Sequence, residues 1–410
     1  MLNPIRVVNF WDNRFKYGIR FRDLFTTNRA AGAVNATASE PGTGTRTVTD
    51  TENKLSISDG YLDFSGPKAS PAYGNPGFWI TDPFSRVPGR TLITAIIPGN
   101  ASTYITHIGF DDNKASTLGV NYFLLSSNSE VKTADKVSGT SASLMTWYLG
   151  EKLYFAVILK AAGADYWVRR VGGAWTLINS TTGATDASVY AGLISFNLVG
   201  KFCFLLISDV FVTNPTPELT QLTACLSINI LAYGDSKTLT TGDTTGGRGY
   251  PTRMSTNKVD FVLSPDRIGV GGQTVASMKA RVDADLAAAS GTPDFILCNL
   301  GANDVGSMPV EATWKANYQY IFSAMRTKWT NVKIYVMRPW RRGYATECNT
   351  LASWIGDLVV SNPGVVYEGP DERVFLENGD DGVTYTGDGI HPNAVGYTLT
   401  ATKWRESIGY

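Results

Sequence analysis

The sequence has few of the residues on which metal and redox sites depend. Its 410 residues include only two histidines and four cysteines. The cysteines are far apart and form no CxxC pair, so neither a zinc cluster nor a dithiol motif is predicted. We therefore expect buried thiols, no metal site and no other cofactor. These cysteines are Cys203, Cys225, Cys298 and Cys348.

The chain also lacks an excess of charge of either sign, because 36 basic residues balance 36 acidic ones. No nucleic-acid partner and no anionic membrane surface is therefore predicted. No apolar run approaches the roughly 18 residues that a membrane span requires. The N-terminal segment has no continuous apolar stretch and contains Asp12 and Arg14, so no signal peptide is predicted. A cytoplasmic or virion-associated location is the resulting expectation.

The pattern of apolar and turn residues along the chain changes near residue 214. Before this point, short runs rich in β-branched and aromatic residues alternate with turn residues, which predicts an all-β antiparallel sandwich over residues 1–214. Residues 28–58 are small and polar, and we expect loops or an extended edge there. The clearest strand candidates are residues 91–97, 152–160, 165–171 and 201–212.

A second domain is expected over residues 228–410, after a linker or helix start at residues 215–227 that contains two prolines. Continuously apolar short runs alternate with helical stretches, which predicts a doubly wound α/β domain with a parallel sheet. In residues 310–328, four large apolar side chains recur at helical spacing, which predicts a core-facing helix. They are Trp314, Tyr318, Ile321 and Met325.

Ser236 lies in AYGDSKT, residues 232–238, directly after an apolar run. It is either a turn residue or a nucleophile at the carboxyl edge of a parallel sheet. A nucleophilic serine needs a base, and His391 is the candidate because Asp388, three residues earlier, can orient its ring. His107 lies in a β-rich run and is interpreted as a structural strand residue. No G-x-S-x-G motif occurs, which disfavours an ordinary α/β-hydrolase.

Two further segments follow strands of the second domain. IGVGGQT, residues 268–274, offers backbone N–H groups that can approach a substrate oxygen, and NLGANDV, residues 299–305, presents the Asn303 amide. The alternative for each is an ordinary turn. The glycine segment is a poor dinucleotide fingerprint, because Thr274 replaces the last glycine.

The ordered set GDS, Gly-Gly, GAND and DGIHPN resembles the SGNH (GDSL-type) hydrolase family over about residues 226–410. The resemblance implies an α/β/α flavodoxin-like fold with Ser236, Asp388 and His391 as the catalytic triad. It also implies an oxyanion hole formed by Ser236, Gly272 and Asn303. Because Gly271 adjoins Gly272, the backbone N–H of either glycine can be the second oxyanion donor. Lys237 stands where the family motif has leucine, and we expect it to be exposed at the mouth of the site.

The first domain resembles concanavalin A-like lectin and laminin-G-like sandwiches, along the segments 77–84, 154–178 and 204–214. This resemblance implies a jelly-roll sandwich that binds glycans. Trp167 and Trp175 are candidate stacking platforms for sugars, with inter-sheet core packing as the alternative. A sandwich joined to an esterase also resembles some phage tail or particle proteins.

The sequence therefore predicts a serine esterase acting on short acyl groups, specifically acetyl groups, of a small ester or an acylated carbohydrate. The alternative is a glycan-binding or structural particle protein whose α/β domain has lost activity. The complete set of five site residues favours the enzyme. A homo-oligomer formed through the sandwich is a further expectation.

Overall fold

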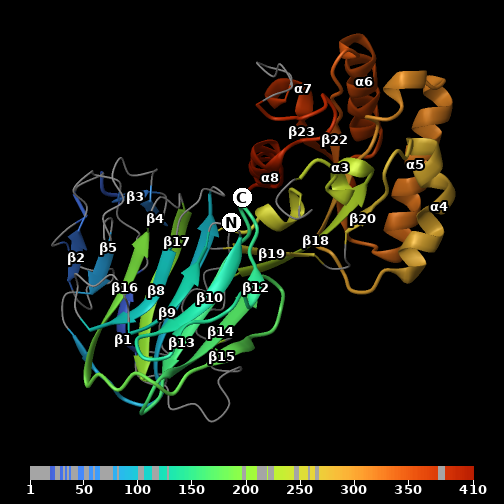
Figure 1. Cartoon of the computed structure of the whole chain (residues 1–410). Helices are drawn as coiled ribbons and strands as arrows, with labels where there is room; N and C mark the ends of the chain where they lie inside the picture. The colour runs from blue at the N-terminus through green and yellow to red at the C-terminus, as the bar shows by residue number, and fades with distance from the viewer. Residues whose placement is uncertain are drawn as a thin grey trace. The chain divides into compact units, whose positions relative to one another are not determined.

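The chain divides into two compact units, residues 1–225 and 226–410 (Figure 1). The computed structural model describes residues 19–23, 28–30, 33–34, 37, 45–49, 55–58, 61–64, 77–80, 83–99, 106–112, 120–126, 129–195, 200–209, 219, 226–243, 249–256, 259–263, 267–376 and 384–410.

The described part of the N-terminal unit consists mainly of two antiparallel sheets. One has the order β15-β14-β13-β7-β17-β4-β3, with β1 also paired to β17. Its strands are β1 (Ile19–Asp23), β3 (Leu55–Ser58), β4 (Tyr61–Phe64), β7 (Arg90–Pro98), β13 (Leu153–Leu159), β14 (Ala164–Arg170), β15 (Thr176–Ser180) and β17 (Gly200–Asp209).

The other sheet has the order β11-β10-β9-β8-β16-β5-β2, with β12 paired to β10 and β6 to β16. Within residues 28–58, β2 and β3 each end the order of a sheet, which fits the extended edge expected there. The strands of this second sheet are β2 (Arg46–Thr49), β5 (Gly77–Ile80), β6 (Phe84–Ser85), β8 (Thr106–Asp111), β9 (Asn121–Leu125), β10 (Glu130–Asp135), β11 (Gly139–Thr140), β12 (Met145–Thr146) and β16 (Ser188–Ser195).

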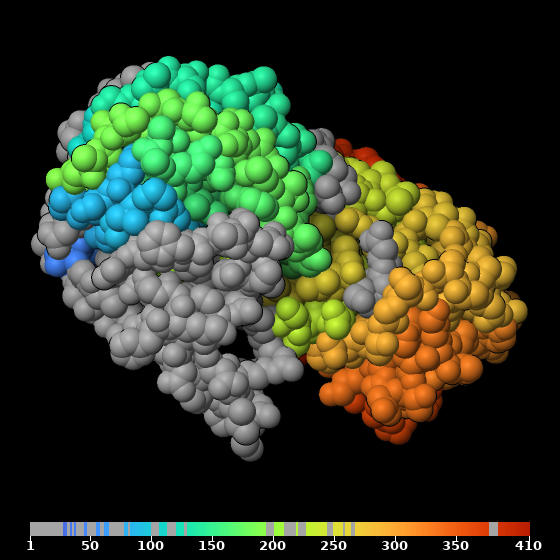
Figure 2. Space-filling model, turned by 90° about the horizontal axis from the view of Figure 1, so that it is seen from below, coloured from blue at the N-terminus to red at the C-terminus, as the bar shows by residue number. Residues whose placement is uncertain are grey.

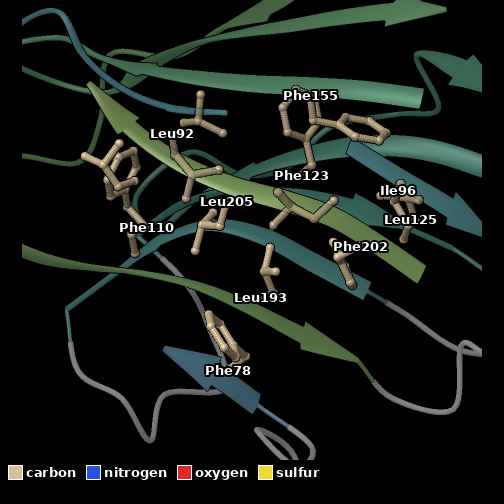
Figure 3. Close-up of a cluster of buried hydrophobic side chains, with 14 of the residues drawn as sticks. Phe78, Leu92, Ile96, Phe110, Phe123, Leu125, Phe155, Leu193, Phe202 and Leu205 are labelled. Atoms are coloured by element: carbon tan, nitrogen blue, oxygen red, sulfur yellow. The ribbon is translucent and has the colours of Figure 1, made fainter. Parts of the chain in front are cut away.

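Apolar side chains of both sheets form one buried cluster (Figure 3). Phe155 of the first sheet packs edge-on against Phe123 of the second, with ring centroids 4.8 Å apart. Alternate residues of β13 point into this cluster because successive side chains of a strand point to opposite faces. The β-rich, antiparallel character predicted for the N-terminal unit is confirmed, whereas its jelly-roll topology stays a prediction.

The opposite face of the first sheet carries a second apolar layer. Tyr154, Ala156 and Ile158 alternate with the inward residues of β13 and belong to this layer. Leu219, from the segment that follows the last strand of the unit, packs there too. Both faces of the first sheet are therefore buried along β13.

The C-terminal unit contains a parallel sheet with the order β19-β18-β21-β22-β23, and β20 also pairs with β18. β18 begins two residues before the predicted domain start at 228, so residues 226 and 227 belong to the strand and not to the linker. Of the remaining predicted linker, only Leu219 lies within the described residues. The strands are β18 (Leu226–Gly234), β19 (Val259–Leu263), β20 (Ile268–Gly269), β21 (Phe295–Asn299), β22 (Lys333–Arg338) and β23 (Val366–Asp371).

Apolar layers cover both faces of this sheet, which explains why its strands are continuously apolar. One face packs against α4 (Val275–Ala288), α5 (Glu311–Lys328) and α6 (Ala345–Ser361). Residues of this helical layer, coloured gold to orange, form much of the unit's surface in Figure 2. The other face packs against α8 (Ala394–Ile408) and the short helix η2 (Pro251–Arg253).

The predicted helix at residues 310–328 is confirmed as α5. Its four predicted core residues are buried, and Trp314 lies edge-on to Tyr318 with ring centroids 4.6 Å apart. Cys203, Cys298 and Cys348 are buried thiols outside any disulfide, as expected, while Cys225 lies outside the described residues. Among the helices of the described residues, none is long and apolar enough to cross a membrane.

Candidate active site

The order of the parallel strands places two of the predicted motifs side by side. β18 precedes β19 in the chain, but its other neighbour is β21, so the chain connections diverge between β18 and β21. Ligands of open α/β sheets bind at such a switch point, outside the carboxyl ends of the strands. Ser236 follows β18 and Asn303 follows β21, so both lie at this edge.

A tight turn presents Ser236 at the end of β18. Asp235 caps the short helix α3 (Ser236–Leu239), and its buried carboxylate accepts a hydrogen bond from the Lys237 backbone N–H at 3.0 Å. Asp at a helix N-cap satisfies a backbone donor that the helix leaves unpaired. Ser236 is 6% exposed, so access to its Oγ is restricted.

The segment before α8 brings the predicted base to this serine. The Asp388 carboxylate accepts hydrogen bonds from the backbone N–H groups of Ile390, at 2.9 Å, and His391, at 2.8 Å. Its second oxygen lies 2.6 Å from His391 Nδ1, and His391 Nε2 lies 2.9 Å from Ser236 Oγ. Ser236, His391 and Asp388 thus form one continuous chain of contacts.

The ionisation of Asp388 assigns the histidine tautomer. Partial burial raises the pKa of this carboxyl, but hydrogen bonds from the backbone and ring of His391 and from the Ile390 backbone outweigh it, leaving the pKa at about 2. Asp388 is therefore ionised at neutral pH and can only accept hydrogen bonds. Nδ1 then carries the ring proton, and Nε2 is left to accept the Ser236 hydroxyl hydrogen.

Gly242 lets the chain after α3 pass close to His391. Its φ of +87° lies in the left-handed region, and a Cβ atom built there would lie 2.7 Å from the His391 Cβ. Any side chain at this position would displace the histidine or strain the backbone. The loop after the serine thereby supports the imidazole.

The candidate oxyanion donors come from three strand ends. Asn303 Nδ2 donates to the Gln273 carbonyl oxygen at 3.0 Å and approaches the Asp235 carboxylate at 3.4 Å, so these segments are in contact. Gly272 has a φ of +71°, and no heavy atom lies within 4 Å of where its Cβ would be. Gly271 is equally open, so the choice between these two donors stays open.

The prediction that Lys237 is exposed is wrong. Its side chain is 1% exposed, and its ammonium group donates to Glu372, which is completely buried, at 2.5 Å. The same ammonium donates to the Trp340 carbonyl oxygen at 2.8 Å, while the Trp340 backbone N–H donates to Glu372 at 3.1 Å. This network joins the serine turn to the segments after β22 and β23.

Sequence reasoning missed Glu372 and Trp340. Glu372 begins the short helix α7 (Glu372–Phe375) and lies 135 residues from Lys237 along the chain. The signal available in the sequence was Lys237, a charged residue next to the nucleophile. A lysine that is buried at such a position requires a carboxylate partner. The position of that partner depended on β23, a strand that the sequence reasoning did not identify.

The candidate glycan residues of the N-terminal unit belong to the outer apolar layer. Trp175 is 4% exposed, lies edge-on to Tyr154 with ring centroids 6.3 Å apart, and has the Arg169 guanidinium 5.8 Å from its ring centre. This burial argues against the predicted stacking of a sugar on Trp175, because neighbouring side chains occupy its surroundings. Trp167 is half-buried in the same layer, and its glycan role stays a prediction.

His107, the second histidine, lies in β8 of the N-terminal unit and is 7% exposed. Its ring lies 4.4 Å from that of Tyr122, centroid to centroid. Burial lowers the pKa of His107 to about 4, so the ring is neutral at physiological pH. These features fit the structural role predicted for it. Among the described residues, no group of His, Cys, Asp and Glu side chains is arranged to hold a metal ion.

Asp304, next to Asn303, should make the stability of the C-terminal unit depend on pH. It is 4% exposed and accepts hydrogen bonds from the Val275 backbone N–H, at 3.1 Å, and from Trp314 Nε1, at 3.2 Å. Burial raises its pKa to about 6 despite these bonds. Asp304 therefore contributes to the free energy of unfolding below about pH 4, where it is protonated in both states. This contribution, at most about 3 kcal/mol, is lost as the pH rises through 6.

Denaturant unfolding of Asp304→Asn and of the unmodified chain between about pH 4 and pH 7 tests this. The variant should show a flatter dependence of the free energy of unfolding on pH, whatever its absolute stability. Asp283→Asn, an exposed change on α4, is the matched control and should keep the original slope. Equal slopes for all three proteins would contradict the prediction.

Part of the chain matches the model of a known protein family. The model of the GDSL-like Lipase/Acylhydrolase family matches residues 232–399. This match does not extend to the N-terminal unit, whose resemblance to lectin-like sandwiches stays a prediction. No curated protein sequence matches the chain.

Several solved structures match the chain at low identity. A lipolytic G-D-S-L family member from Veillonella parvula is 19% identical, with 44% of this chain and 98% of that chain covered and a TM-score of 0.36. The psychrotrophic esterase EstA from Pseudoalteromonas sp. is 18% identical, with 44% and 96% covered and a TM-score of 0.37. A family two carbohydrate esterase from Cellvibrio japonicus is 14% identical, with 93% and 96% covered and a TM-score of 0.37. The family match identifies the C-terminal unit as a GDSL/SGNH hydrolase domain and supports ester hydrolysis as its general chemistry.

Proposed function

We propose that this protein is a serine esterase that hydrolyses short-chain acyl esters, specifically acetyl esters of carbohydrate. The observation that carries the proposal is the contact chain from Ser236 Oγ through His391, at 2.9 Å, to Asp388, at 2.6 Å. A serine activated by an adjacent base that a third group orients is the general arrangement of an acyl-transfer nucleophile.

Acylation begins when Ser236 Oγ attacks the ester carbonyl carbon while His391 Nε2 takes the hydroxyl proton. The carbonyl π electrons move to oxygen and form a tetrahedral oxyanion. The Ser236 backbone N–H, the Gly272 backbone N–H and the Asn303 amide donate hydrogen bonds to this oxygen. The oxyanion then collapses, the bond to the alcohol oxygen breaks, and the imidazolium protonates the leaving alcohol.

Deacylation repeats these steps with water. His391 takes a proton from a water molecule as its oxygen attacks the acyl carbon, and the second tetrahedral oxyanion uses the same donors. Its collapse breaks the bond to Ser236 Oγ, and the imidazolium returns the proton to that oxygen. Asp388 remains ionised throughout and stabilises the imidazolium, in keeping with its low pKa of about 2.

Two sequence features support the finer parts of the proposal. No long apolar segment is available to cover a fatty acyl chain, which favours a short acyl group. The resemblance of the N-terminal unit to lectin-like sandwiches favours a carbohydrate as the alcohol part. A series of p-nitrophenyl esters of increasing acyl length, measured beside an acetylated polysaccharide, tests both features, and we expect the highest kcat/KM for acetate.

The role of the histidine is tested by two substitutions. We expect His391→Ala to lower kcat on p-nitrophenyl acetate by about 10³–10⁶-fold, and Asp388→Ala by about 10²–10⁴-fold, because an unoriented imidazole retains part of its activity. His107→Gln is the control and should retain turnover. If His391→Ala keeps the original rate, the assignment of the base is wrong. If the unmodified chain hydrolyses no ester, a glycan-binding or structural particle protein becomes the better account.

A further inference from the structure

Two arginines follow β22 at the carboxyl edge of the parallel sheet. The Arg342 backbone N–H donates to the Gly389 carbonyl oxygen at 2.9 Å. A Cβ atom on Gly389 would lie 3.0 Å from Arg342 Nε and Cζ, so the guanidinium group rests on the backbone of this residue. Gly389 lies between Asp388 and His391, and Arg342 therefore lies directly beside the histidine loop.

Arg341 lies against the loop that carries Asn303. A Cβ atom on Gly306 would lie 3.6 Å from Arg341 Nη1. Gly306 belongs to the short helix η3 (Val305–Ser307), which begins two residues after Asn303. The two consecutive arginines thus touch the two loops that contribute His391 and Asn303.

The same segment is tied to the nucleophile turn. The Trp340 carbonyl oxygen accepts a hydrogen bond from the buried Lys237 ammonium at 2.8 Å. The Pro339 ring lies 3.0 Å from where a Cβ on Gly301 would be, so the segment also packs against the end of β21. These contacts hold the two arginines at the edge where Ser236 lies.

Neither arginine forms an ion pair among the described residues. Arg338, three positions earlier, pairs with Glu368 at 2.6 Å and approaches Asp371 at 3.8 Å. The side chain of Arg342 is exposed and, among the residues that the structure describes, donates to the Thr386 hydroxyl alone, at 3.5 Å. Arg341 is half-buried, and its guanidinium lies 4.9 Å from the centre of the Tyr344 ring. Both therefore have N–H donors for a ligand.

Asp388, on the loop beside Arg342, forms no hydrogen bond or ion pair with these donors among the described residues. Asp388 accepts hydrogen bonds from the backbone N–H groups of Ile390 and His391 and from the His391 ring. The Asp388 carboxylate therefore interacts with the His391 imidazole and with the backbone of its own loop. Within the part of the chain that the structure describes, the carboxylates of Asp235 and Glu372 beside the serine turn are completely buried. Of the described charged side chains at this edge, Asp388 is exposed but already bound to His391, whereas Arg342 is exposed without an ion-pair partner among the described residues.

We propose that Arg341 and Arg342 bind a carboxylate on the alcohol part of the substrate, so that the enzyme prefers acetyl esters of acidic sugars. The inference rests on the proposed function, in which the acyl group is too small to carry the charge itself. A planar guanidinium matches a carboxylate through paired N–H donors, and both residues are arginine and not lysine. Binding there places the charged group beside the serine and the histidine.

Matched probes test this preference with the full chain: 3-acetoxybenzoate, which carries a carboxylate on its alcohol part, and 3-acetoxybenzamide, which is neutral and of similar shape. For Arg341→Gln/Arg342→Gln, we expect kcat/KM on the benzoate to fall by about 10–100-fold, mainly through KM, because charge-assisted hydrogen bonds are lost. The value of kcat/KM on the benzamide should change by less than about threefold, because this neutral probe forms no charge-assisted hydrogen bond that the substitutions would remove. Arg342→Lys keeps the charge without the fork and should give an intermediate ratio of the two rates.

Salt and a remote substitution complete the design. Raising the ionic strength should lower the benzoate-to-benzamide ratio of the unmodified enzyme and leave that of the double variant nearly unchanged. Arg281→Gln on α4 removes an arginine that pairs with Asp285, at 2.7 Å, and should keep the original ratio. If the double variant keeps the original ratio, or loses activity equally on both probes, the inference is wrong. Hydrolysis of neither probe by the unmodified enzyme would instead refute the proposed function, and the inference with it.

Discussion

Replacing Ser236 by alanine is expected to lower kcat for ester hydrolysis by about 10³–10⁶-fold, because the variant lacks the oxygen that becomes acylated. The residual rate would come from the oxyanion donors and from substrate binding alone. Removal of the hydroxyl leaves no large cavity and no unpaired charge. The hydroxyl contacts His391 Nε2 at 2.9 Å, so the free energy of unfolding should change by only about 1 kcal/mol. Initial rates on p-nitrophenyl acetate and thermal unfolding of the same samples measure both quantities.

Ser323→Ala provides the matched control, because Ser323 is an exposed serine on α5. It should retain the original kcat. Mass spectrometry after treatment with an alkyl fluorophosphonate gives a second readout: Ser236 should be modified in the unmodified chain, and the Ser236→Ala protein should not react. Turnover at the original rate in Ser236→Ala, or modification of another serine in the unmodified chain, would show that Ser236 is not the nucleophile.

Replacing Glu372 by alanine is expected to destabilise the C-terminal unit by about 3–5 kcal/mol, the usual cost of breaking a buried ion pair from one side. The side chains of Lys237 and Glu372 are 1% and 0% exposed, so water cannot solvate the lysine that remains. The Trp340 backbone N–H, which donates to Glu372 at 3.1 Å, would lose its acceptor as well. Because Lys237 adjoins Ser236, the loss should also reduce kcat.

Denaturant unfolding measures this effect. Esterase activity is used as the probe of unfolding, so that the C-terminal unit is the one monitored. Lys237→Met combined with Glu372→Leu should recover part of the lost stability, because no buried charge is left without a partner, while the Trp340 backbone groups lose theirs. Glu311→Ala breaks an exposed pair with Lys315, whose side chains are 50% and 23% exposed, and should cost less than about 1 kcal/mol. A Glu372→Ala protein as stable as this control would contradict the role given to the buried pair.

The sequence alone was sufficient to predict that the C-terminal unit contains a parallel sheet, although not its strand β23, and to predict the core helix α5. Strands covered on both faces are continuously apolar, and α5 repeats large apolar residues at helical spacing, so both signals are local in the chain. The pairing of Asp388 with His391 was equally predictable, because a three-residue separation allows a carboxylate to fold back on the ring. The same reasoning brought Ser236 and Asn303 to one edge, since carboxyl ends of parallel strands share an edge.

Only the tertiary structure determined which polar and aromatic side chains are buried. Lys237 was expected to be exposed, but Glu372, 135 residues away, pairs with it inside the protein. Trp175 was a candidate sugar platform, but the outer face of its sheet carries a second apolar layer that encloses it. The exposure of a side chain is the result of contacts between segments far apart in the chain, and such contacts leave no periodic signal in the residues around it. Local spacing therefore predicts which face of a strand or helix a residue occupies, whereas the packing of distant segments decides what that face meets.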